Sequence, residues 1–323
     1  MKSRVIARSV TTKQSPVDNS KIAFIFPGAA VEPCGAEATF FSKNREIMGP
    51  FLVEASEITG VDFVESLDKG RTGLLDERSS QLFTFAFSHG VAMAHQQAGI
   101  APAALAGYSM GIYATVSVSG ALAFSECCGM VGMAFDIMKK HCRGEEFAMG
   151  AVVGLSHAET QRLCASGKYP SVYHTNTNNE TCGVFSGKKD EIGKFFEDAL
   201  AQGALSTVLL NVTIPYHHPQ YLIEASHEFL RAIQDLSWRD AGIPVISSID
   251  QKPLVKAGDL VDFIAMSLAS PVHWHHVVLA IAAMGMATLY ECGPGISLCQ
   301  NGRFIQNGLR YVTIKKALKR TGA

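Results

Sequence analysis

One serine of this 323-residue chain lies in a pentapeptide that can build a nucleophile. The segment Gly107-Tyr108-Ser109-Met110-Gly111 reads G-x-S-x-G, follows a short apolar run and precedes a helical pattern. In a strand–turn–helix setting, small neighbours let the serine occupy a strained turn with its hydroxyl exposed. The helix N-terminus behind it supplies N–H groups for an oxyanion, and Met110 is the natural first donor. The alternative is an ordinary turn in which Ser109 only caps the helix.

A serine hydroxyl is a poor nucleophile until a neighbouring base takes its proton, and histidine is the usual base. The chain has 11 histidines, so composition alone does not choose one. His217 lies just after a strand predicted at 206–213, where the chain would return to the cleft. A lone histidine is more often structural than catalytic, so from the residues alone both roles stay open for His217.

The elements that must position these residues follow an α/β pattern. Short apolar runs with turn signals predict strands, and residues at helical spacing predict helices. Strands that alternate with helices indicate a parallel sheet. The predicted strands are 22–26, 103–107, 244–248 and 287–291, and the predicted helices are 34–57, 79–98 and a helix from 110 onward.

The middle of the chain has a different character. Strand-like and helical segments follow one another there in the order βαββαβ, which is that of a ferredoxin-like unit. We therefore predict a small subdomain at 147–213, inserted into a large α/β domain formed by 21–146 and 214–323. Residues 1–20 are polar and predict a flexible leader, with a transit peptide as the alternative.

Composition excludes several classes of function. A net charge of -1 with a pI of about 6.8 argues against a nucleic-acid binder. The most apolar stretch, 277–290, falls short of the ~20 residues that a membrane-spanning helix needs. The eight cysteines form no C-x-x-C pair, so we expect no metal site. Scattered thiols in a chain of this length suit a reducing compartment, and we expect a cytoplasmic protein.

The chain resembles the malonyl-CoA:acyl-carrier-protein transacylases and the acyltransferase domains of polyketide synthases from about residue 21 to residue 314. The serine motif is generic, but the ordered set of landmarks is specific. These landmarks are Phe26-Pro27-Gly28, Gln81, Gly107 to Gly111, Gly120, Ala148 to Leu155, Asn176, Asn178, Pro215-Tyr216-His217, Pro271 to Trp274 and Glu291 to Gly295. The resemblance implies a hydrolase-like large domain with a parallel sheet and the same inserted ferredoxin-like subdomain.

The resemblance also implies roles for particular residues. Ser109 corresponds to the nucleophile and His217 to its base, while Met110 and Ala29 supply the oxyanion N–H groups. A main-chain carbonyl orients the histidine in this family, and the corresponding segment here points to His273. The family's acyl pocket maps onto Tyr108, Ile112, Ala134, Tyr216 and Gln81.

The departures from the family gather at this pocket. The usual G-Q-G after Phe-Pro is Gly28-Ala29-Ala30, and the glutamate after the serine motif is Ile112. Malonyl-handling members place an arginine 25 residues beyond the nucleophile, where this chain has Ala134. A buried carboxylate without a fixed cation costs several kcal/mol. We therefore expect a preference for an uncharged acyl group over malonyl.

The expected function is transfer of an acyl group between coenzyme A and acyl carrier protein in fatty acid or polyketide biosynthesis. Coenzyme A and phosphopantetheine enter as substrates, and no cofactor, nucleic acid or membrane is expected. A polyketide or fatty acid synthase is a further expected partner. Three alternatives stay open: a carrier-protein thioester hydrolase, a malonyl transacylase with a rebuilt carboxylate site, and a silent scaffold that binds carrier proteins.

Overall fold

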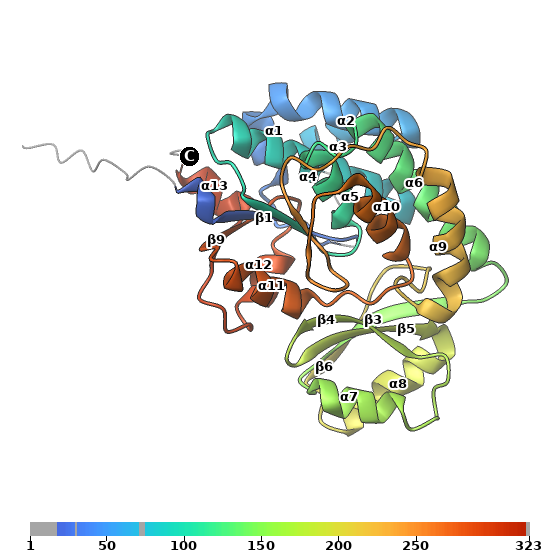
Figure 1. The fold of residues 1–323 in the computed structure, drawn as a ribbon. Helices are drawn as coiled ribbons and strands as arrows, with labels where there is room; N and C mark the ends of the chain where they lie inside the picture. Colours follow the sequence, from blue (N-terminus) through green and yellow to red (C-terminus); the bar gives the residue numbers. More distant parts are fainter. Residues whose placement is uncertain (1–17, 30, 71–74, 321–323) are drawn as a thin grey trace, which may run out of the picture.

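The computed structural model describes residues 18–29, 31–70 and 75–320, and its larger part is built on a six-stranded sheet (Figure 1). Five strands run parallel, and only the last strand at one edge pairs antiparallel with its neighbour. In spatial order the strands are β10 (Arg310–Val312), β9 (Thr288–Glu291), β1 (Ile22–Phe26), β2 (Ala104–Gly107), β7 (Val245–Ile246) and β8 (Pro253–Leu254).

Helices cover both faces of this sheet, so its central strands are completely buried. Side chains alternate along β1: Phe24 and Phe26 join the core under the helices of the first half of the chain, whereas Ile25 packs with Trp274 and Leu298. The helices are η1 (Asn19–Lys21), α1 (Glu37–Lys43), α2 (Arg45–Thr59), α3 (Phe63–Asp68), α4 (Glu77–Gln97), α5 (Gly111–Val118), α6 (Phe124–His141), α9 (Pro219–Ile233), α10 (Ala257–Met266), α11 (Trp274–Ala283), α12 (Ser297–Gly302) and α13 (Ile314–Arg320).

A second, antiparallel sheet lies below the first in Figure 1, with two helices on its outer face. Its spatial strand order is that of a ferredoxin-like βαββαβ unit. The elements are β3 (Phe147–Val153), α7 (His157–Cys164), β4 (Tyr173–Asn179), β5 (Cys182–Lys188), α8 (Lys189–Ala201) and β6 (Ser206–Leu209). The α/β class with a small second sheet is thus confirmed. All four strands fall inside the predicted insertion 147–213, whose exact boundaries stay a prediction.

The two parts are joined by backbone as well as side chains. The N–H of Thr177 in β4 donates to the carbonyl of Val272 (2.9 Å), and the Val272 N–H donates to Thr175 (2.8 Å). This bridge ties the edge of the small sheet to the segment that precedes α11. It fixes the small sheet beside the carboxyl ends of the parallel strands.

Two sequence predictions need correction, and one lies mostly outside the described residues. The predicted helix 34–57 is two helices, because Asn44 leaves helical geometry and its side chain bonds the Phe40 carbonyl (2.8 Å). The strand predicted at 206–213 ends at Leu209. Of the predicted leader, residues 1–17 lie outside the described ranges. Within those ranges, no helix is both long and apolar enough to cross a bilayer.

Candidate active site

Ser109 occupies a sharp turn between β2 and α5, in the left-handed backbone region with φ of 52°. Non-glycine residues rarely adopt this conformation, which costs about 1–3 kcal/mol. Two glycines make the turn possible. A Cβ at Gly107 would overlap the backbone of Ile112, and one at Gly111 would overlap the carbonyl oxygen of Phe26. The glycines of the motif are thus required by the close approach of three backbone segments.

The loop after β1 reaches the same place because β1 and β2 are adjacent and parallel, with Phe26 opposite Gly107. The Tyr108 N–H donates to the Phe26 carbonyl (2.9 Å), which continues the sheet into the turn. A Cβ at Gly28 would lie 3.2 Å from the Cβ of Ser109. This packing brings Ala29 and Met110 to one cavity with Ser109. That their N–H groups hold an oxyanion stays a prediction.

His217 arrives from the opposite side, on the segment that leads from β6 to α9. Its Nε2 lies 2.7 Å from Ser109 Oγ, although 108 positions separate the two residues. Its Nδ1 lies 2.8 Å from the carbonyl oxygen of Ser267. A carbonyl only accepts, so Nδ1 carries the proton and Nε2 is the acceptor for the serine hydroxyl. This tautomer is the one that a general base requires.

The backbone of His217 is also strained, with φ of 64°. Its N–H donates to the carbonyl of Leu268 (3.1 Å), and the His218 N–H closes a turn onto Pro215 (3.1 Å). His218 itself turns away and its Nε2 donates to the Ser171 carbonyl (2.9 Å). The structure thus distinguishes the two adjacent histidines by direction: only His217 faces the serine.

The carbonyl that orients His217 belongs to Ser267 and not to His273, so the prediction for His273 is wrong. His273 is the residue before α11, where its ring packs with that of His276. Ser267 instead ends α10, and the last carbonyls of a helix lack partners within the helix. They also form the negative end of the helix dipole, which favours an imidazolium at this position.

The environment of His217 predicts an unusual pH dependence. Burial lowers its pKa to about 4, against the partial offset of its bonds to backbone carbonyls. The base is therefore neutral above that pH, and kcat/KM for acyl loading should hold down to about pH 5 and fall with a midpoint near 4. A solvated histidine would give a midpoint near about 6.5. A pH–rate profile measures this, and a loss of activity centred at 6.5 in folded enzyme would contradict it.

The same shift has a consequence for folding, which serves as the control. In the unfolded chain the imidazole takes up a proton below about pH 6.5, whereas the folded chain excludes it until about pH 4. Stability is therefore full above pH 6.5 and declines as the pH falls through this window. His89, His95 and His174 are buried in the same way and add to the decline. Circular dichroism at each pH separates unfolding from titration of the base.

A cavity of about 30 Å³ lies beside Ser109 and His217. This is room for one or two water-sized groups. Three predicted pocket residues line it, namely Ile112, Gln81 and Tyr216. The other lining side chains are Tyr113, Met138, Ser267 and Leu268. Met138 is four residues after Ala134 on the same apolar face of α6, whereas no sequence pattern singled out Tyr113, Ser267 or Leu268.

Tyr108 and Ala134, the other two predicted pocket residues, do not line this cavity. The Tyr108 hydroxyl points to the small sheet instead. It donates to Asn178 (2.8 Å) and accepts from Asn176 Nδ2 (3.0 Å). Ala134 is 1% exposed and packs in the core.

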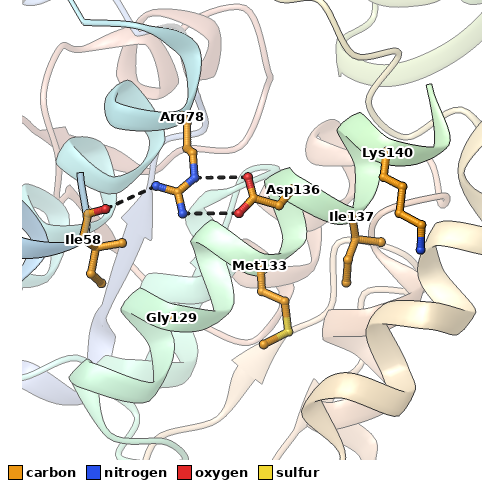
Figure 2. A pocket seen from close by; sticks show the side chains of 7 residues that line it. All are labelled: Ile58, Arg78, Gly129, Met133, Asp136, Ile137 and Lys140. Atoms are coloured by element: carbon orange, nitrogen blue, oxygen red, sulfur yellow. Dashed lines mark hydrogen bonds and ion pairs between the residues drawn. The ribbon is translucent and has the colours of Figure 1, made fainter. Parts of the chain in front are cut away.

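No lysine or arginine lines the cavity within the described residues. The basic residues that follow Ala134 are engaged elsewhere: Lys139 donates to Thr213 Oγ1 (2.7 Å), and Lys140 pairs with Glu228 (2.8 Å). A separate hollow of about 500 Å³ lies on the outer face of α6 (Figure 2). Arg78 and Asp136 line that hollow and form a two-pronged ion pair. Arg78 therefore does not supply a cation to the Ser109 cavity.

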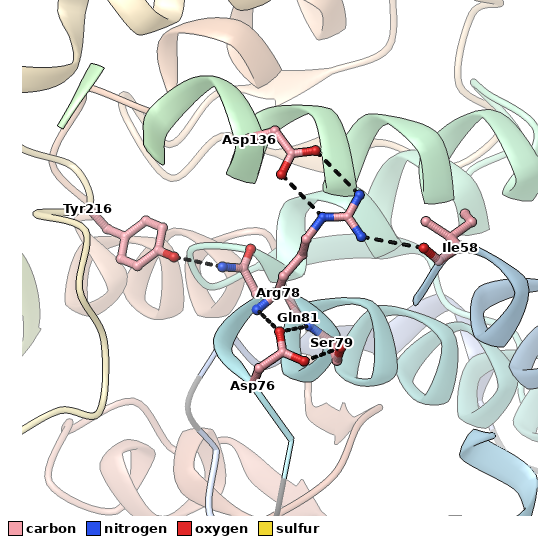
Figure 3. Close-up of polar contacts among 7 residues, drawn as sticks. All are labelled: Ile58, Asp76, Arg78, Ser79, Gln81, Asp136 and Tyr216. Atoms are coloured by element: carbon pink, nitrogen blue, oxygen red, sulfur yellow. Dashed lines mark hydrogen bonds and ion pairs between the residues drawn. The ribbon is translucent and has the colours of Figure 1, made fainter. Parts of the chain in front are cut away.

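Tyr216 is held rigidly at the cavity wall. Its hydroxyl accepts from Gln81 Nε2 (2.7 Å) and donates to Glu77 Oε1 (2.7 Å). Figure 3 shows the Gln81 amide reaching from α4 to the tyrosine ring. Sequence reasoning missed Glu77, because nothing in its pattern separates it from a solvated residue in the first turn of a helix.

Within the described ranges, no three or more His, Cys, Asp or Glu side chains are grouped so that they could hold a metal ion. All eight cysteines are free, and burial raises the pKa of every one of them. These thiols therefore act as small apolar side chains.

Known proteins agree with this arrangement. The acyl transferase domain family matches residues 54–309. The malonyl CoA-acyl carrier protein transacylase of Salmonella typhimurium is 27% identical over 85% of this chain and 90% of its own. The polyketide biosynthesis protein ThaF of Burkholderia thailandensis is 27% identical over 90% of this chain and 25% of its own.

A solved structure has the same fold. The acyl-carrier-protein S-malonyltransferase of Burkholderia pseudomallei superposes with a TM-score of 0.83 over 93% of this chain and 99% of its own, at 27% identity. The family match spans well over half of the sequence and contains both Ser109 and His217. The chain therefore belongs to the acyl transferase domain family and is an acyltransferase.

Proposed function

We propose that this acyltransferase moves a short, uncharged acyl group between coenzyme A and acyl carrier protein through an ester on Ser109. The contact of 2.7 Å between Ser109 Oγ and His217 Nε2 carries the proposal. The carrier protein and the setting, fatty acid or polyketide biosynthesis, are inferred from the names of the relatives in S. typhimurium and B. thailandensis.

The proposed reaction has two matched halves. His217 Nε2 takes the proton of Ser109 as Oγ attacks the thioester carbonyl, and the N–H groups of Met110 and Ala29 hold the oxyanion. The C–S bond then breaks and the leaving thiolate takes the proton from His217. In the second half, the phosphopantetheine thiol of the carrier gives its proton to His217 and attacks the ester carbonyl. The C–O bond then breaks, and His217 returns the proton to Ser109 Oγ. The carbonyl of Ser267 holds the imidazole in place throughout.

The proposed acyl preference rests on the lining of the cavity. A malonyl group would bring its carboxylate among Met110, Ile112, Tyr113 and Met138 with no described cation to meet it. A desolvated carboxylate needs such a partner, and arginine is the residue best matched to it. The volume of about 30 Å³ further favours an acetyl or similarly short group over a medium chain.

Competition between acyl donors tests this preference. With equal concentrations of acetyl-CoA and malonyl-CoA, we expect intact-protein mass spectrometry to show acetyl on the enzyme in at least about tenfold excess. A panel extended to octanoyl-CoA should show loading that falls with chain length. Efficient malonyl loading with none from the uncharged donors would overturn the preference.

The lifetime of the acyl-enzyme distinguishes transfer from hydrolysis. We expect the ester to persist for minutes in buffer and to discharge when an acyl carrier protein bearing phosphopantetheine is added. Loss of the ester within seconds in buffer alone would instead assign the chain to carrier-protein thioester hydrolysis.

A further inference from the structure

A chain of hydrogen bonds runs outward from the wall of the Ser109 cavity. Tyr216 lines the cavity, and its hydroxyl donates to Glu77 Oε1 (2.7 Å). Glu77 and Gln81 are four residues apart on α4, so both reach the same hydroxyl from one helix face. The ring of Tyr216 is thereby fixed between the cavity and a carboxylate.

The other oxygen of Glu77 is held on the outer side. Glu77 Oε2 accepts from the Thr213 N–H (3.1 Å) and from Thr213 Oγ1 (2.8 Å). Thr213 Oγ1 in turn accepts from Lys139 Nζ (2.7 Å). The lysine is thus separated from the carboxylate by a neutral hydroxyl, and Glu77 Oε1, on the cavity side, accepts from the phenol of Tyr216.

We propose that Glu77 is a specificity-determining residue that selects against acyl groups ending in a carboxylate. Its negative charge lies one side chain behind the cavity wall, and no described lysine or arginine lines the cavity to offset it. Like charges repel one another more strongly across the partly buried Tyr216 ring than across water. The inference rests on the proposed acyl transfer and adds to it an active discrimination beyond the missing arginine.

Glu77 has two separable effects, because it is both a hydrogen-bond acceptor for Tyr216 and a negative charge. As a hydrogen-bond acceptor it positions the ring, which affects every acyl group alike. As a charge it affects only acyl groups that carry a carboxylate. The ratio of kcat/KM for malonyl loading to kcat/KM for acetyl loading isolates the second effect, because a purely structural role leaves this ratio unchanged.

The variant Glu77→Gln tests the charge, because it preserves the size of the side chain and an oxygen for the Tyr216 hydroxyl. We expect the malonyl-to-acetyl ratio to rise about tenfold. We expect kcat/KM for acetyl to change by less than about threefold. Asp136→Asn is the matched control, because it also removes one carboxylate. Asp136 is on α6 and pairs with Arg78, and neither residue is bonded to Tyr216 (Figure 3). The ratio of this variant should equal that of the wild type.

A second variant protects the test against a folding defect in the first. Tyr216→Phe keeps the ring and the charge of Glu77 but deletes the hydroxyl that joins them, so adding Glu77→Gln should raise the malonyl-to-acetyl ratio in this background as it does in the wild type. An unchanged ratio in Glu77→Gln, or an equal fall for both acyl groups, would overturn the proposal. Failure of the proposed function is distinct, since then neither acyl group would load on wild-type Ser109.

Discussion

Replacing Ser109 with alanine is expected to abolish acyl loading and to lower transfer by about 10⁴-fold or more. Ser109 Oγ lies 2.7 Å from His217 Nε2, and no other hydroxyl of the described cavity lining has such a contact with a histidine nitrogen. Folding should be preserved, because alanine removes a single oxygen and one hydrogen bond, worth about 1 kcal/mol. Steady-state transfer from acetyl-CoA to carrier protein measures the effect, with thermal unfolding as the check on structure.

The fold offers a matched control for this variant. Ser117 on α5 is also buried and also contacts a buried histidine, with Oγ 3.0 Å from His89 Nδ1. That pair lies outside the Ser109 cavity. Ser117→Ala should therefore keep transfer activity and lose about 1 kcal/mol of stability, the worth of a buried hydrogen bond. Equal losses of activity in the two variants would mean that the Ser109 result reports packing and not chemistry.

The second large effect is expected from Gly111→Ala. The added methyl group would overlap the carbonyl oxygen of Phe26 and lie 2.8 Å from that of Pro27. Neither can retreat, because Phe26 is paired in the central strand of the sheet. We expect a loss of about 3 kcal/mol in the free energy of unfolding. Transfer should fall even in folded protein, since the displaced loop carries Ala29. Denaturant titration and kinetics measure the two effects.

Gly193→Ala is the comparison for this substitution. Gly193 is in the interior of α8, and an added Cβ there meets nothing within 4 Å. Alanine is the better helix former, so we expect a stabilisation of up to about 1 kcal/mol and full activity. If Gly111→Ala were equally harmless, the tight packing described for the serine turn would be incorrect.

The serine turn could be predicted from sequence because all of its determinants are local. The strand before Ser109, the two glycines and the helix after it follow one another in the chain, and each has a residue pattern of its own. The role of Ala29 was implied only by the family resemblance, and the parallel pairing of the strands that end at Phe26 and Gly107 explains why this residue lies beside the serine.

The partners of His217 could not be predicted in the same way. The carbonyl of Ser267 acts through the backbone, so its residue type leaves no trace in the sequence. The left-handed conformation of His217 depends on contacts with Leu268, 51 positions away. The direction of Tyr108 was likewise set by Asn176 and Asn178 on the small sheet. Long-range packing decides such features.

The sequence showed that an arginine is absent at position 134, but it did not show which side chains line the cavity instead. Ala134 marks the absent cation, yet it lies in the core and the cavity is closed by Met138 and Tyr216 instead. Glu77 enters the account only through the bond of its carboxylate to Tyr216. The negative charge of Glu77 near the cavity therefore became evident only from the folded structure.

The central claim is that acyl transfer passes through an ester on Ser109, formed with the help of His217. The most direct measurement is peptide-resolved mass spectrometry of the enzyme after brief exposure to acetyl-CoA, with His217→Ala beside the wild type. We expect the acetyl group on the peptide that contains Ser109, and a loading rate reduced by at least about 10³-fold in His217→Ala. Transfer at the wild-type rate with the acetyl group on another residue, or on none, would contradict the account.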